Sequence, residues 1–169
     1  EYTTRAGRKV YDGGGIMPDI RTEPEYISRF AMTLYALGFI EDFGDEYVRR
    51  HPGQQIDIRT FSITDGDYAE FAEVPYESDT RRALKKLREA AKTDRFEEVE
   101  QQIAAIDSTL RDDTATNLET YRKEIVESIN NDIVLRHGYS EGVIEHSLPD
   151  DGDVLKAIEI LGNGQEYAR

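Results

Sequence analysis

Apolar residues recur at helical spacing through most of this chain, and that pattern constrains the fold more than any other feature of the sequence. A broad apolar stripe predicts one long helix over 26–50. Alternating apolar residues over 54–63 favour a short extended stretch after it. Further stripes predict helices over 95–111 and 114–137, which could pair as an antiparallel hairpin. The sequence therefore predicts a mainly α fold, a multi-helix assembly over 25–169.

Capping signals predict the ends of several helices. Thr64, followed three residues later by Asp67, predicts a capping box that opens a short helix. Asp79 predicts the start of a basic amphipathic helix, and Gly138 predicts a C-terminal cap. The acidic run 150–153 suits the N-terminus of a last helix and lacks the closing glutamate of a calcium loop.

Aromatic residues recur at steps of four and five along the first predicted helix and make one of its faces wide and apolar. Two interpretations are open: this face packs under the later helices, or it offers a large apolar surface to a partner. Burial is the usual fate of such a stripe, so internal packing is favoured. The stripe consists of Tyr26, Phe30, Tyr35, Phe39, Phe43 and Tyr47.

The charge balance limits the kinds of partner. The 169 residues carry a formal net charge of −14 at pH 7, which argues against nucleic acid because phosphate binding needs a surplus of lysine and arginine. No apolar run approaches the length of a membrane span. The absence of cysteine excludes disulfides, thiol nucleophiles and zinc–thiolate sites. Proteins are the expected partners.

Residues that could carry chemistry favour structural roles instead. His51, His137 and His146 lack the spacing of metal ligands, and the first two suit helix C-termini. The glycine run 13–15 lacks the lysine that a phosphate-binding loop requires and favours a turn. No serine has a lysine three residues after it. We expect no catalytic residue, cofactor or metal in this chain.

The first 24 residues differ from the rest and predict strand and loop. The run Tyr2-Thr3-Thr4-Arg5-Ala6-Gly7-Arg8, followed by Gly15-Ile16-Met17-Pro18-Asp19-Ile20, resembles the end of the catalytic core in tail-specific (carboxyl-terminal processing) serine proteases, peptidase family S41. The form over 10–19 is similar to members from Bacteroidetes-like bacteria. The run 155–161 is similar to the terminal helix on which many such proteins close.

The resemblance implies two regions: 1–24 would end a protease core, and 25–169 would form its helical C-terminal domain. It implies a serine-lysine dyad, and usually a PDZ domain that captures substrate C-termini, both upstream and absent here. The chain alone would then hydrolyse nothing. The residues that the resemblance assigns to core docking are Tyr2, Thr4, Gly7, Arg8, Gly15, Ile16, Pro18 and Asp19.

The resemblance also implies the partners of the helical module, which would pack on or position the protease core. These are the upstream core and PDZ domain of the same polypeptide, the protein substrates of the parent enzyme and, in a homo-oligomer, a second copy. The expected location is the bacterial periplasm or cell envelope. Without the core, residues 1–24 would be solvated, fold back on their own chain or add to a neighbour. An independent acidic helical interaction domain, unconnected with proteases, is the alternative.

Overall fold

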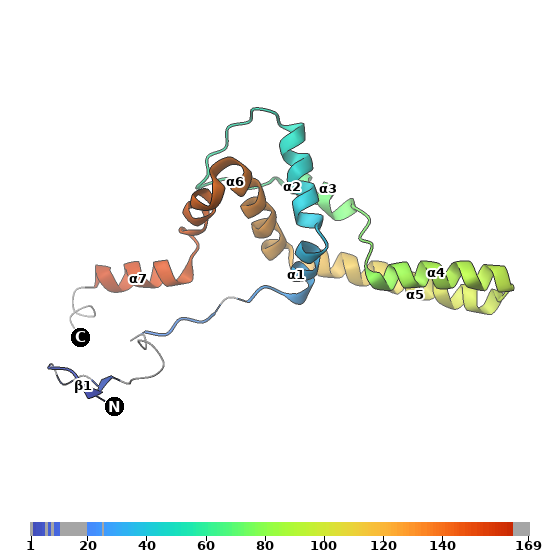
Figure 1. Ribbon diagram of the computed structural model, residues 1–169, viewed down its shortest axis with the longest axis horizontal. Coiled ribbons are helices and arrows are strands. Elements are labelled where there is room, and N and C mark those ends of the chain that lie inside the picture. The colour runs from blue at the N-terminus through green and yellow to red at the C-terminus, as the bar shows by residue number, and fades with distance from the viewer. Residues whose placement is uncertain (1, 6, 8, 11–19, 25, 164–169) are drawn as a thin grey trace. The chain divides into compact units, whose positions relative to one another are not determined.

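The computed structural model of the chain is mainly helical, which confirms the predicted fold class (Figure 1). The described residues are 2–5, 7, 9–10, 20–24 and 26–163. The chain divides into two compact units, of which the larger is Ile27–Leu148 and the smaller combines Glu1–Tyr26 with Pro149–Arg169. No helix in the described part of the chain is both long and apolar enough to cross a membrane.

The larger unit is built from helices alone. They are α1 (Arg29–Ala36), α2 (Phe39–Arg50), α3 (Asp65–Glu73), α4 (Asp79–Asp94), α5 (Glu97–Thr120) and α6 (Arg122–Ser147). The regular elements described in the smaller unit are β1 (Tyr2–Thr3), β2 (Lys9–Val10) and α7 (Gly152–Gly162).

Helix α6 supplies the centre of the core of the larger unit. Its Ile125, Ile129 and Ile133 recur every four residues on one face and have no exposed surface. Aromatic side chains from α2 and α3 complete the cluster, and the rings of Phe43 and Phe71 meet edge to face with centroids 5.4 Å apart. The core is thus formed where α6 meets α1, α2 and α3.

The single long helix predicted over 26–50 is wrong, because the structure has two helices there. The side chain of Ser28 caps α1, which therefore begins later than predicted. Gly38, with φ 80°, separates α1 from α2. A glycine in that left-handed conformation redirects the chain at little steric cost, which an L side chain could not do.

The predicted hairpin of two long helices lies one element earlier than the sequence indicated. Helix α5 continues through residue 114, so the helix start predicted there is wrong. Helix α5 pairs instead with α4, and the connection is short because Arg95 adopts a left-handed conformation with φ 60° ahead of Phe96. Figure 1 shows the two helices side by side.

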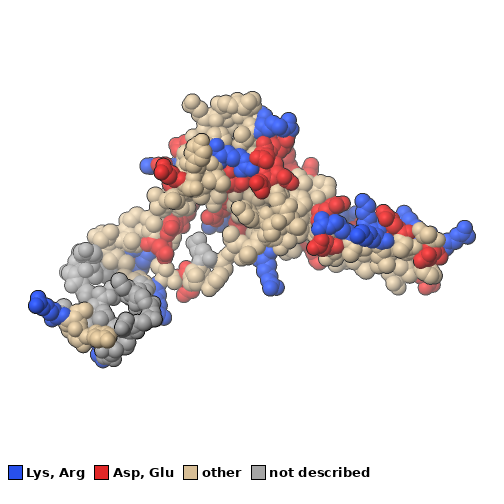
Figure 2. Space-filling view, in the orientation of Figure 1, with Lys and Arg blue, Asp and Glu red and all other residues tan. Residues whose placement is uncertain are grey.

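Complementary charge accompanies an apolar seam in the α4–α5 hairpin. Lysine and arginine side chains gather along it in Figure 2, most of them on α4, while the first turn of α5 is acidic. Ala91 of α4 and Ile103 of α5 are buried, and Arg88 pairs with Asp107 at 3.4 Å. Leu87 remains half exposed on the hairpin surface.

Local capping signals were predicted more accurately than helix lengths. The capping box of Thr64 and Asp67 is present in both directions and opens α3. Asp151 caps α7 through two backbone amides, as the acidic run predicted. Helix α4 begins at the predicted place, although Ser78 rather than Asp79 is its cap. The extended stretch predicted over 54–63 is wrong, because these residues form turns and irregular backbone.

In the smaller unit, the N-terminal segment folds back on itself. Strands β1 and β2 are antiparallel, with Tyr2 opposite Val10 and Thr3 opposite Lys9. This is one of the three outcomes expected for a strand without its core. Helix α7 buries none of its residues, and its Leu155, Ile158 and Leu161 are exposed.

A substitution at Gly44 tests the close contact of α2 with α6. A Cβ added at Gly44 would overlap Oδ2 of Asp132, which a short ion pair with Arg136 holds in place. We predict that Gly44→Ala lowers the free energy of unfolding by about 1–3 kcal/mol, as overpacking does. The control is Gly66→Ala in α3, where the Cβ would meet only Thr64 Oγ1 at 3.5 Å. Urea denaturation should show no loss for the control, and equal effects of the two would contradict this packing.

Candidate docking groove

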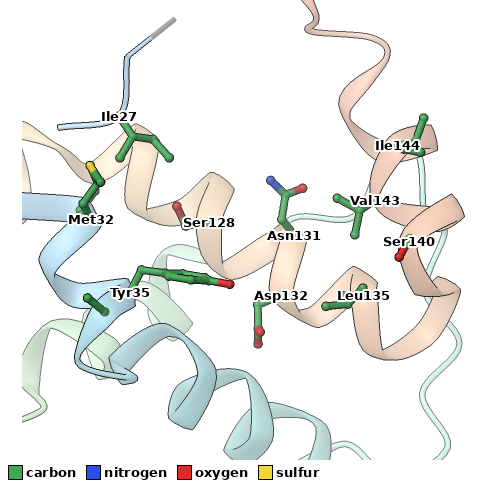
Figure 3. Close-up of a pocket in the computed structure, with 12 residues that line it drawn as sticks. Ile27, Met32, Tyr35, Ser128, Asn131, Asp132, Leu135, Ser140, Val143 and Ile144 are labelled. Carbon is green, nitrogen blue, oxygen red and sulfur yellow. The ribbon is translucent and has the colours of Figure 1, made fainter. Parts of the chain in front are cut away.

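An apolar groove of about 730 Å³ lies between α1 and α6 (Figure 3). Met32 and Tyr35 of α1 form one side, and Leu135 with Ile144 of α6 form part of the other. These large side chains are 44–68% exposed, which is unusual for apolar residues gathered in one place. The complete lining is Ile27, Ala31, Met32, Tyr35, Ala36, Ser128, Asn131, Asp132, Leu135, Ser140, Val143 and Ile144.

The α1 side of the groove is fixed to α6 by a hydrogen bond at the start of the helix. The backbone N–H of Ser28 donates to Glu124 Oε2 at 2.8 Å, across 96 positions of sequence. Ala31 and Leu34 then turn inward and are buried, so helical geometry directs Met32 and Tyr35 outward. The anchored N-terminus of α1 therefore keeps the side chains of Met32 and Tyr35 exposed.

A sharp break in α6 shapes the other side. Tyr139 has φ 56° and ψ −160°, a region that residues other than glycine rarely adopt, and it separates two helical stretches. The break falls where Gly138 predicted an end, but the left-handed residue is Tyr139. Gly138 is needed for a different reason, since a Cβ there would overlap Ile58 Cδ1. Ile58 also lies against Gly142, where an added Cβ would be 3.4 Å from the same Cδ1.

The loop before α3 braces this break from behind. His146 Nδ1 donates to the Ile58 carbonyl at 2.6 Å, and Arg59 pairs with Glu145 at 2.5 Å. Deeper in the core, Asn130 Oδ1 accepts from the backbone N–H of Ile63 at 2.9 Å. The Ile63 amide is thus satisfied by an asparagine side chain rather than by a neighbouring strand.

Two neighbouring residues of α6 give the groove its polar character. Asn131 projects between the two apolar sides in Figure 3, and its Oδ1 is buried and accepts no hydrogen bond from the described residues. Such an acceptor is costly unless something donates to it. Burial raises the pKa of Asp132 above its usual range, although Arg136 beside it acts in the opposite direction. Arg136 also binds Asp45 at 2.8 Å.

Histidine and serine side chains form hydrogen bonds with nearby backbone groups. His51 and His137 each donate through Nδ1 to the carbonyl four residues earlier, at 2.8 and 2.9 Å. Ser78 accepts from the Arg81 amide as an N-cap, and Ser128 donates to the Glu124 carbonyl at 2.8 Å. Their positions are those of helix ends and helix surfaces.

Three of the residues that the resemblance assigned to core docking are described. Tyr2 lies in β1, and Gly7, with φ 83°, donates its backbone N–H to the Thr4 carbonyl at 2.9 Å in the turn toward β2. They lie in the smaller unit, whereas the groove belongs to the larger one. Arg8, Gly15, Ile16, Pro18 and Asp19 lie outside the described residues.

Sequence patterns located part of the groove without identifying it. The aromatic stripe divides: Phe43 and Tyr47 are buried in the core, Phe30 and Phe39 pack against it, and Tyr35 lines the groove. Internal packing is therefore confirmed for these four rings, Tyr26 is 83% exposed, and the binding of a partner by the exposed rings stays a prediction. Leu135 and Val143 gave no separate signal, because they continue the helical pattern of α6.

Comparison with known proteins shows which family this helical region matches. A family model described as "Probable PDZ-protease, C-terminal helical domain" matches residues 30–161. The match includes every lining residue of the groove except Ile27. Comparison with curated proteins and with solved structures gave no match.

The buried carboxyl of Asp132 predicts a pH dependence. Because its pKa is raised, the folded chain holds this proton more tightly than the unfolded chain. Its contribution is fully present below the unfolded pKa of about 3.9 and is lost as pH rises through the folded value. The charged groups facing it are Arg136, Glu41 and Asp45.

Asp132→Asn should remove this contribution. We predict that the stability of the wild type relative to Asp132→Asn increases as pH falls from about 7 to about 4, through the carboxyl range. Urea midpoints of both proteins across that range measure the difference. A difference that stays constant, or that shifts toward the variant on acidification, would show that burial does not control this carboxyl.

Proposed function

The chain belongs to the family of C-terminal helical domains of probable PDZ-proteases, and from this premise we propose that it is the non-catalytic helical part of a carboxyl-terminal processing serine endopeptidase of family S41. Its role in this proposal is to pack on the protease core and position it. The resemblance over residues 2–20 supports the serine-protease assignment. Family membership argues against a helical domain unconnected with proteases.

The single observation that carries the docking role is the exposed apolar groove between α1 and α6. A domain that worked alone would gain by burying Met32, Tyr35, Leu135 and Ile144, since each buried side chain of this size stabilises a protein by about 1.5–3 kcal/mol. Exposed apolar surface of this kind is typical of interaction sites. In the proposal, the protease core covers it.

The proposal places the catalytic serine and lysine in the core rather than in this chain. The serines described at Ser28 and Ser78 cap helices, and Ser128 and Ser147 donate to backbone carbonyls. None of these roles requires an activated hydroxyl. A periplasmic or cell-envelope location, protein substrates and assembly as a homo-oligomer belong to the same proposal and derive from the resemblance.

Proteolysis by the isolated chain tests the non-catalytic role. We predict that residues 1–169 alone do not cleave unstructured substrates with apolar C-termini, because the chain supplies neither nucleophile nor base. The measurement is peptide cleavage followed by mass spectrometry. Cleavage that survives purification and is lost when one serine of this chain is replaced would overturn the assignment.

A charge in the groove tests docking in the full-length protease. We predict that Leu135→Asp lowers its proteolytic activity by roughly tenfold or more, because an unpaired carboxylate buried in an apolar interface is strongly unfavourable. Leu87→Asp on the α4–α5 hairpin is the matched control, since Leu87 is a similarly exposed helical leucine outside the groove. Equal activities of the two variants would contradict docking through the groove.

A further inference from the structure

We infer that the α1–α6 groove binds one amphipathic helix of the protease core, and that this helix carries a lysine or arginine whose N–H group donates to Asn131 Oδ1. The inference rests on the proposed docking role and adds the chemistry of the occupant. Its evidence is the spacing of the lining residues, the kind of polar groups among them and the charge of the chain.

The lining has the spacing of two helix faces laid side by side. On α6 it uses Ser128, Asn131, Asp132 and Leu135, which recur at steps of three and four residues, and α1 contributes a face of the same kind. The ridges of two neighbouring helices form a groove into which the side chains of a third helix can pack. An apolar helix face is therefore the occupant that the groove fits best.

Three of the four polar residues in the lining provide hydrogen-bond acceptors on one stretch of α6. Asn131 Oδ1 is buried without a donor, and the carboxylate of Asp132, one oxygen of which binds Arg136, is directly beside it in sequence. The hydroxyl of Ser128 already donates to the Glu124 carbonyl, which leaves its oxygen free only to accept. An occupant without donors would leave this buried acceptor unsatisfied, whereas a helix that brings an N–H group would satisfy it.

Charge favours a cationic donor from the protease core over a second copy of this chain. The chain carries a net charge of −14, so two copies repel each other, whereas a basic residue of the protease core is attracted to the acidic chain. Ile27, which lines the groove, lies just before Ser28, the cap of α1, and the family match begins at residue 30. The polypeptide therefore enters the helical domain beside the groove, where an upstream segment can reach it.

Asn131→Leu tests this inference, because it should change the rate of amide exchange in opposite directions in the isolated chain and in the full-length protease. In residues 1–169 alone, the substitution removes an acceptor that nothing satisfies, so the amides of residues 125–134 should exchange roughly tenfold more slowly. In the full-length protease, the same substitution deprives the docked donor of its acceptor. The same amides should then exchange roughly tenfold faster than in the wild type.

The control is Asn117→Leu on α5, a half-buried asparagine outside the groove. This control measures the effect of the higher helix propensity of leucine alone. It should change amide exchange in the same direction in the isolated chain and in the full-length protease. If these amides exchange more slowly in the Asn131→Leu variant of both proteins, the inference is overturned. The docking role is then decided separately, by the effect of Leu135→Asp on activity. If Leu135→Asp has no effect on activity either, the proposed function itself fails at this surface.

Discussion

The buried face of α6 is the interaction on which the rest of the larger unit depends. Ile125, Ile129 and Ile133 are completely enclosed, and side chains from α1, α2 and α3 belong to the cluster that encloses them. Polar side chains of α6 then hold the neighbouring segments in place through hydrogen bonds. Glu124 binds the start of α1, Asn130 binds the loop before α3, and Arg136 binds α2, while His146 holds the same loop beyond the break.

The groove follows from these anchors rather than from any motif of its own. Because α1 is tied to α6 at its N-terminus and turns away at Gly38, only one of its faces is buried. The break at Tyr139 then directs Val143 and Ile144 toward the same opening. An unfavourable backbone conformation persists only where surrounding contacts hold it, and here the loop around Ile58 provides them. The proposed docking surface is thus a product of core packing.

The features that depend on residues close together in the sequence were predicted correctly. The helical class, the capping box at Thr64 and the cap at Asp151 need only residues within one turn, and all are present. The division at Gly38 was missed because the apolar stripe continues across it. Residues 54–63 resembled a strand because their apolar residues alternate, whereas in the structure the amide of Ile63 binds Asn130, far away in sequence. The groove could not be predicted, since its two sides come from segments about a hundred residues apart.

The central claim is that the protease core covers the α1–α6 groove. Its most direct test is a photo-activated cross-linker in place of Leu135 in the full-length protease, with Leu87 as the reference position. Mass spectrometry of the products identifies the residue that each position reaches. Position 135 should link to a segment of the protease core, and position 87 should not. Links from position 135 only to a second copy, or only to residues within 1–169, would contradict it.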